Sequence, residues 1–137
     1  MSRDTAKKVS LGAGVVYLLV GVLGFIPGIT VPTEHPGHGL LLGIFAVNAL
    51  HNLVHLLAGA ALVIGGLADH EVTSRINWVL AAVFALLVPA SLIAPVLEAV
   101  PLNIPDTLLH AATAVLTAVI AMAAARGAEP MGAGRAA

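Results

Sequence analysis

The sequence contains no cysteine and has few charged or aromatic side chains. Of its 137 residues, 9% are charged and 4% are aromatic. The lack of cysteine excludes disulfides, thiolate metal ligands and thiol redox chemistry. A soluble domain carries about 25% charged residues, so this chain has too few charges to solvate a soluble surface. The net charge of −1 and the apolar composition give no indication of nucleic-acid binding.

Long stretches without charge are the main feature of the chain. Crossing the hydrocarbon core of a bilayer takes about 20 predominantly apolar residues in a helix. The sequence therefore predicts an all-α fold, a bundle of four transmembrane helices, in a single integral membrane domain over residues 1–137 surrounded by the lipid bilayer. The predicted helices cover about 9–26, 48–68, 76–97 and 107–125, each free of Asp, Glu, Lys and Arg.

The basic residues predict how the helices are oriented. All of them precede the first predicted helix, separate the second from the third, or follow the fourth: Arg3, Lys7, Lys8, Arg75, Arg126 and Arg135. The loops 27–47 and 98–106 contain none, and the prolines in 27–47 disfavour helix there. The positive-inside rule predicts a multi-pass protein of the plasma membrane with both termini in the cytoplasm.

Two phrases 55 residues apart match each other. One runs from Asn48 to His55 and the other from Asn103 to His110, so that each Asn is followed seven residues later by His. Asn is a common helix N-cap. The match predicts either two duplicated helical hairpins or a chance similarity between apolar helices.

A second ionisable residue precedes each of these histidines by one helical turn. His51 and His55 are four residues apart, as are Asp106 and His110, so each pair shares one helix face. Both helices run inward from the outer surface in the predicted topology, which places all four side chains at one depth. Histidine is costly inside a membrane unless it has partners, so this cluster is the candidate functional site.

Three interpretations of the cluster are open. In the first, the side chains only cap helices and form hydrogen bonds within the bundle. In the second, they bind a transition metal such as zinc, copper or iron, with imidazole ligands from His51, His55 and His110 and a carboxylate ligand from Asp106. A variant of this interpretation makes His55 and His110 the two axial ligands of a haem. In the third, the cluster moves protons or ions, or forms the active site of a membrane enzyme.

The sequence favours a non-catalytic role. It contains no nucleophile–base pair, no phosphate-binding loop and no HExxH motif. We therefore expect a non-catalytic subunit or binding module, with a membrane enzyme or transporter as the alternative. Glycines on one face of the first helix, including Gly14 and Gly21, predict close packing, either in a larger membrane complex or in a homo-oligomer.

Three segments resemble a family of small bacterial four-helix membrane proteins known only as a domain of unknown function. Residues 43–59 contain Asn48-x-x-His51-Asn52-x-x-His55-Leu, and the fourth helix contains Asp106 with His110 in an Asp/Asn-x-x-Leu-His phrase. Residues 15–24 are similar as well, and the resemblance covers most of 9–125. Ala49 stands where Pro is common. The resemblance implies a multi-pass protein of the bacterial inner membrane and implies no activity.

Overall fold

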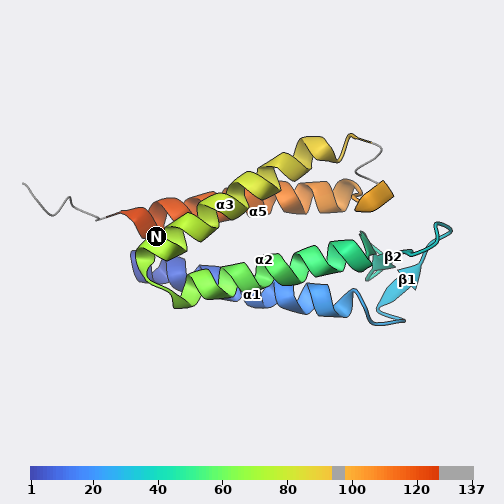
Figure 1. Ribbon diagram of the computed structural model, residues 1–137, viewed down its shortest axis with the longest axis horizontal. Helices are drawn as coiled ribbons and strands as arrows, with labels where there is room; N and C mark the ends of the chain where they lie inside the picture. Colours follow the sequence, from blue (N-terminus) through green and yellow to red (C-terminus); the bar gives the residue numbers. More distant parts are fainter. Residues whose placement is uncertain (94–97, 127–137) are drawn as a thin grey trace, which may run out of the picture.

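Four long helices form two antiparallel hairpins. The computed structural model of the protein describes residues 1–93 and 98–126. Figure 1 shows α1 beside α2 and α3 beside α5, the two pairs with the most extensive contact. All four helices are long and apolar enough to cross a membrane, which confirms the predicted all-α bundle. Their bounds are α1 Arg3–Leu23, α2 Ala49–Leu67, α3 His70–Ala90 and α5 Ile104–Ala125.

Helices α1 and α3 begin earlier than predicted, at their charged ends, whereas α1 ends at Leu23 rather than at about residue 26. Helix α1 begins at Arg3 rather than at about residue 9, because Ser2 accepts a hydrogen bond from the Thr5 amide. Helix α3 begins at His70 rather than at about residue 76, after the Asp69 side chain accepts from the amide of Val72. Such capped turns are stable in polar surroundings, so charge-free stretches underestimate the helices at these starts. Helix α3 ends at Ala90 and residues 91–92 form a turn, so the predicted continuous helix to 97 is wrong; residues 94–97 lie outside the described residues.

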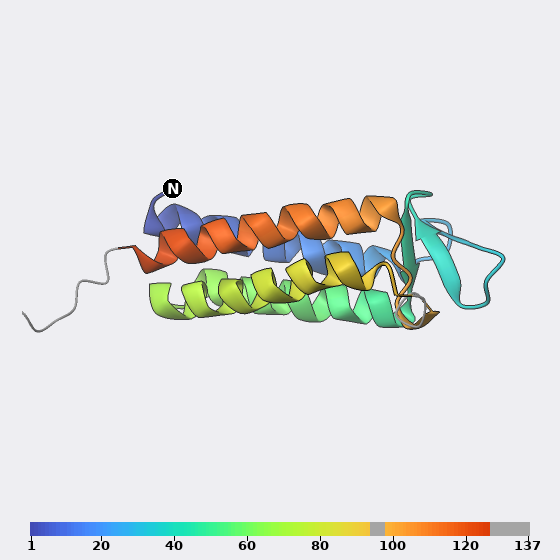
Figure 2. The ribbon, with the colours of Figure 1, turned by 90° about the horizontal axis from the view of Figure 1, so that it is seen from above.

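A small antiparallel sheet connects α1 to α2, which the sequence did not predict. Its strands are β1 Thr30–Pro32, β2 His38–Leu41 and β3 Phe45–Asn48, in the order β1-β2-β3. Gly43 takes a φ of 72° in the turn between β2 and β3, a conformation that glycine adopts without steric cost. The strands cover one end of the bundle (Figure 2). We call this end the cap end, and the opposite end, where α1 begins and α5 ends, the basic end.

Glycines bring the backbones of α1 and α2 into contact. A Cβ atom added at Gly14 would lie 2.7 Å from the backbone nitrogen of Val63, and one added at Gly59 would lie 2.7 Å from that of Leu18. Gly66 meets the backbone of α1 at Leu11 in the same way, about two helical turns after Gly59. The predicted glycine face therefore packs within the chain. A partner that used the same glycines would have to separate α1 from α2.

Candidate metal centre

Helices α2 and α5 begin in the same way at the cap end. The side-chain oxygen of Asn48 accepts a hydrogen bond from the His51 amide at 2.8 Å, and that of Asn103 accepts from the Asp106 amide at 3.2 Å. The two matching phrases are therefore N-caps followed by first turns. Because both helices start at the same end, their histidines lie at similar depth. The internal duplication itself stays a prediction.

Three histidines converge below these caps. His51, His55 and His110 each offer a ring nitrogen, and these three atoms lie within 4.8 Å of one another. The ring centroids of His51 and His55 are 4.4 Å apart, and those of His51 and His110 are 5.9 Å apart. All three residues are at most 4% exposed. The structure thus brings together the three histidines that the sequence singled out.

Each of the three rings has a buried nitrogen without a hydrogen-bond partner among the described residues. These atoms are His51 Nε2, His55 Nδ1 and His110 Nδ1. The other nitrogen of His51, Nδ1, lies 3.0 Å from the carbonyl oxygen of Pro101. A carbonyl only accepts, so Nδ1 carries the hydrogen and Nε2 keeps its lone pair. A histidine that ligates a metal is commonly held through its second nitrogen in this way.

Aromatic side chains enclose the histidines on the side of the bundle core. The ring of Tyr17 meets His55 edge-on at a centroid distance of 5.4 Å, and the ring of Phe84 lies 5.5 Å from that of His110. The Tyr17 hydroxyl is 2.8 Å from the hydroxyl oxygen of Thr113 and takes part in a hydrogen bond there. The histidines therefore border an apolar core while keeping unpaired nitrogens, an energetically costly arrangement without a ligand.

Asp106 has a different set of contacts. Its Oδ2 atom accepts hydrogen bonds from the backbone amides of Ala46 and Asn103, at 2.9 and 3.1 Å. The bond from Asn103 completes a capping box with the Asn103 side chain, and the bond from Ala46 ties strand β3 to α5. Asp106 is not one of the three converging donors. It lies in the first turn of α5, and the structure gives it backbone partners.

The remaining histidines lie apart from the three. His35 and His38 are near each other in the loop before and within β2, with ring centroids 6.0 Å apart. His70 lies at the basic end, where its Nε2 is 3.1 Å from a carboxylate oxygen of Asp4.

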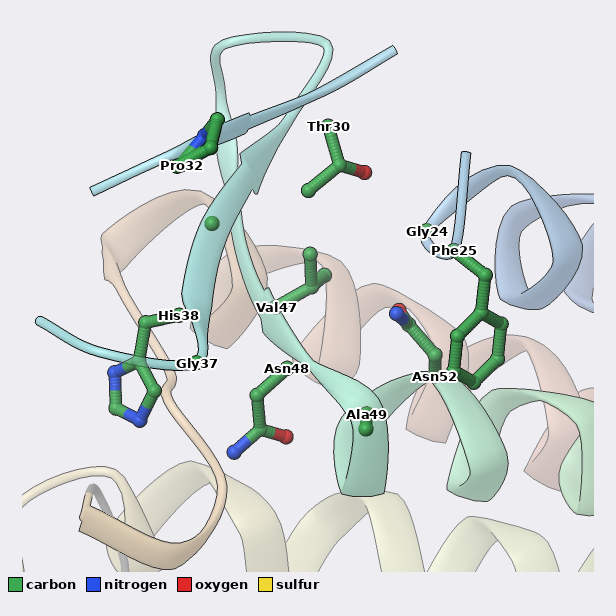
Figure 3. A pocket seen from close by; sticks show the side chains of 11 residues that line it. Gly24, Phe25, Thr30, Pro32, Gly37, His38, Val47, Asn48, Ala49 and Asn52 are labelled. Carbon is green, nitrogen blue, oxygen red and sulfur yellow. The ribbon is translucent and has the colours of Figure 1, made fainter. Parts of the chain in front are cut away.

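Asn52 follows His51 in the chain but faces another space. It lines a pocket of about 330 Å³ between the sheet and the ends of α1 and α2. Figure 3 shows its amide beside Gly24, in the space that a side chain at position 24 would fill. The amide oxygen of Asn52 has no hydrogen-bond partner among the described residues. This pocket is distinct from the histidine group.

Sequence reasoning missed a polar cluster deeper in the bundle. The Asn77 amide nitrogen donates to Ser10 Oγ at 3.0 Å, and Ser10 Oγ donates to the carbonyl oxygen of Leu62 at 2.9 Å. The hydroxyl of Thr73 donates to the carbonyl of Gly65. These bonds link α1, α2 and α3. Isolated uncharged polar residues in apolar runs are the signal that was available, since such residues commonly form hydrogen bonds between membrane helices.

The histidine group has the chemistry of a transition-metal site. Neutral imidazole suits zinc, copper, iron and nickel. Zinc–nitrogen bonds of about 2.0–2.1 Å in a tetrahedron separate the ligand atoms by roughly 3.4 Å. The three nitrogens, within 4.8 Å of one another, would each have to move by no more than about an ångström, which rotation of the rings supplies. Three histidines would leave a fourth coordination position for another ligand.

Comparison with known proteins identifies the family. Neither curated proteins nor solved structures gave a match. The family described as "Domain of unknown function (DUF4383)" matches residues 7–123. The matched segment includes α2, α3, the sheet and the three histidines in full, and omits only the first four residues of α1 and the last two of α5. The chain therefore belongs to the DUF4383 family, and the four apolar helices make it a membrane protein.

Proposed function

We propose that this membrane protein binds one transition-metal ion through His51, His55 and His110. The observation that supports the proposal most directly is the set of unpartnered, buried ring nitrogens on three converging histidines. Bundle histidines that only stabilise the fold would be expected to use these nitrogens in hydrogen bonds, because an unpaired buried polar atom costs about 1–3 kcal/mol. The bond from His51 Nδ1 to Pro101 favours the same function, since it leaves Nε2 as the donor to a metal.

A single ion suits this group better than haem. A haem held by His55 and His110 would need its macrocycle between their two rings. The centroids of those rings are 6.3 Å apart, but the His51 ring lies against both, at 4.4 and 5.9 Å. His51 would therefore compete with the porphyrin for this space. Three nitrogens that converge on one point also suit a single ion with several ligands on one side, whereas haem needs two ligands on opposite faces.

We further propose a non-catalytic role, as a metal-binding module or a subunit of a larger complex in the bacterial inner membrane. The sequence contains no nucleophile–base pair and no phosphate-binding loop, which supports a non-catalytic role. The basic side chains of the described residues gather at the opposite end, which favours cytoplasmic termini by the positive-inside rule. The metal would then lie near the outer surface.

The proposal is tested by measuring metal in protein extracted without chelators. We expect about one equivalent of zinc, copper or iron per chain by elemental analysis, and a large loss of that metal in His55→Ala and in His110→Ala. His35→Ala is the matched control, because it removes an exposed loop imidazole and should retain the metal. An absorption spectrum of the same sample tests for haem, which would give a Soret band.

The outcomes separate the interpretations. Metal content that is equal in wild type and in both core variants rejects the proposed site. A Soret band that disappears in His55→Ala and His110→Ala supports haem in place of a single ion. Loss of metal from His35→Ala alone would move the site to the exposed loop.

A membrane enzyme is the second candidate, because three protein ligands with an open fourth position are typical of catalytic zinc sites. This candidate predicts that a small anion such as azide binds to the metal. In cobalt-substituted protein, azide would change the visible absorption spectrum. A spectrum insensitive to azide and to other small ligands would favour the non-catalytic role.

A further inference from the structure

The basic end contains a pocket lined by two arginines from different helices. The pocket has a volume of about 440 Å³ and lies between α1, α3 and α5. Arg3 reaches it from α1 and Arg75 from α3, while the last turn of α5 contributes Ala124 and Ala125. Arginine binds phosphate oxygens in a fork geometry, so this pocket has the chemistry of a phosphate site.

Interactions within the pocket position the arginines and leave donors for a ligand. The Nε atom of Arg3 donates to the carbonyl oxygen of Ala124 at 3.2 Å, which holds the side chain against α5. Arg75 pairs with Glu71, one turn earlier on α3. Both members of that pair are exposed, with side chains 75% and 70% accessible, and exposed pairs of this kind contribute little stability. A phosphate could therefore replace Glu71 as the partner of Arg75.

An apolar groove lies between two of the same helices, α3 and α5, further from their charged ends. It has a volume of about 370 Å³ and is lined mainly by alanines of α3 and α5. On α3, Arg75 is followed at intervals of three and four residues by Trp78, Ala82 and Ala85, so all four share one face. The groove thus lies on the same face of α3 as Arg75, beyond it toward the middle of the membrane. Trp78 lies one turn from Arg75 and is 48% exposed, as is usual for tryptophan near a membrane interface.

We propose that the arginine pocket and the alanine-lined groove together bind one anionic phospholipid. The headgroup phosphate would lie between Arg3 and Arg75, and an acyl chain would lie along the groove between α3 and α5. Basic pockets between membrane helices bind the headgroups of anionic lipids through the same combination of contacts. A helix of another protein could fill the groove, but among the described residues it would leave Arg3 without an anionic partner and Arg75 with only the exposed Glu71. The charge of the pocket therefore favours a lipid.

The single tryptophan of the chain is a built-in probe for this site. Full-length protein is placed in bilayers that contain brominated phosphatidylglycerol or brominated phosphatidylcholine, and quenching of Trp78 fluorescence gives the relative association of the two lipids. We expect phosphatidylglycerol to be preferred, by roughly fivefold for each arginine that contacts it. Arg3→Gln with Arg75→Gln should abolish the preference, while Glu71→Gln should increase it by removing the competing carboxylate.

Two matched controls separate the site from general charge and from packing. Lys7→Gln with Lys8→Gln removes two positive charges, as the double arginine variant does, but neither lysine lines the pocket or the groove. This variant should retain most of the preference for phosphatidylglycerol. Ala82→Leu fills the groove and should weaken quenching by the lipid, whereas Ala112→Leu, also exposed but outside the groove, should not.

Several results would overturn the proposal. Equal quenching by both lipids in wild-type protein would do so, as would a preference that survives in the double arginine variant. If inorganic phosphate removed the preference for phosphatidylglycerol, the pocket would bind a free anion instead of a lipid. If neither brominated lipid quenched the fluorescence of Trp78, a protein partner or a second copy of the chain would cover the groove.

Discussion

His51 donates a hydrogen bond through Nδ1 to the carbonyl oxygen of Pro101, 3.0 Å away. Pro101 lies just before α5, the helix that carries His110. The segment that precedes α5 therefore orients a histidine of α2, while the helix itself supplies a second histidine. The geometry of the group depends on this segment as well as on the three rings.

Pro101→Gly should lower metal affinity although it leaves all three histidines in place. The glycine retains the carbonyl group but frees the backbone that positions it. Loss of an interaction that orients a metal ligand typically costs about 10–100-fold in affinity, and we expect the lower part of this range. Competition with a chelator measures the affinity. Pro32→Gly in β1 makes the same change away from the histidines, and equal affinities in the two variants would argue against this role for Pro101.

Asp106→Ala should destabilise the protein more than it affects metal content. The substitution leaves the amides of Ala46 and Asn103 without their carboxylate acceptor. Loss of such charge-assisted bonds costs about 2 kcal/mol of unfolding free energy. Thermal unfolding in detergent and elemental analysis on the same sample separate the two effects. Asp4→Ala, at an exposed carboxylate, is the control for loss of charge.

If Asp106→Ala folds but no longer contains metal, Asp106 is a ligand, as the sequence suggested. The structure explains why spacing alone was ambiguous. Asp106 and His110 have the same four-residue spacing as His51 and His55, but Asp106 is also the third residue after an Asn cap. The Asn-x-x-Asp pattern of a capping box directs the carboxylate back to the helix start.

Gly14→Ala should destabilise the bundle by about 1–3 kcal/mol, the usual cost of overpacking a tight contact. Its new methyl group would lie 2.7 Å from the Val63 nitrogen and 2.8 Å from the Gly59 oxygen. Both are backbone atoms, so only movement of a whole helix relieves the clash. Gly12→Ala is the matched control, since a Cβ there meets nothing within 4 Å. Similar unfolding temperatures for the two variants in detergent would contradict the described α1–α2 interface.

Ser10 and Asn77 should show coupled effects on stability. Their hydrogen bond joins α1 to α3, and Ser10 continues the link to the Leu62 carbonyl of α2. Hydrogen bonds between membrane helices contribute about 0.6 kcal/mol on average. A double-mutant cycle with Ser10→Ala and Asn77→Ala should give a coupling of this size. Additive effects of the two substitutions would mean that the bond contributes nothing measurable.

The four helices and the grouping of the histidines followed from the sequence because both depend on long-range patterns of charge. Charge-free runs identify membrane helices, and the count of crossings places His51, His55 and His110 at one end. The helix starts did not follow, because caps such as Ser2 and Asp69 extend helices into charged sequence. A capped turn is stable outside the hydrocarbon core, so the distribution of charged residues along the sequence does not reveal it.

The sheet was missed for a different reason. Its strands contain only three or four residues, too few for an alternating pattern to be recognised. The turn after β2 places Leu42 at a φ of 55° next to Gly43, and leucine gives no indication of such a conformation. The bond between Ala46 and Asp106 joins residues 60 positions apart, so it becomes visible only in the folded chain.

The close packing of α1 against α2 has a consequence for the order of assembly. These helices are neighbours in the chain, and their glycine contacts need nothing from α3 or α5. Domains and local contacts generally form in the order of synthesis, so this hairpin can associate while the rest of the chain is still on the ribosome. His110 is inserted only with α5, which follows the other three described helices in the chain. The three histidines therefore come together only once α5 is in place, and a chain inserted no further than α3 would lack the three-histidine group.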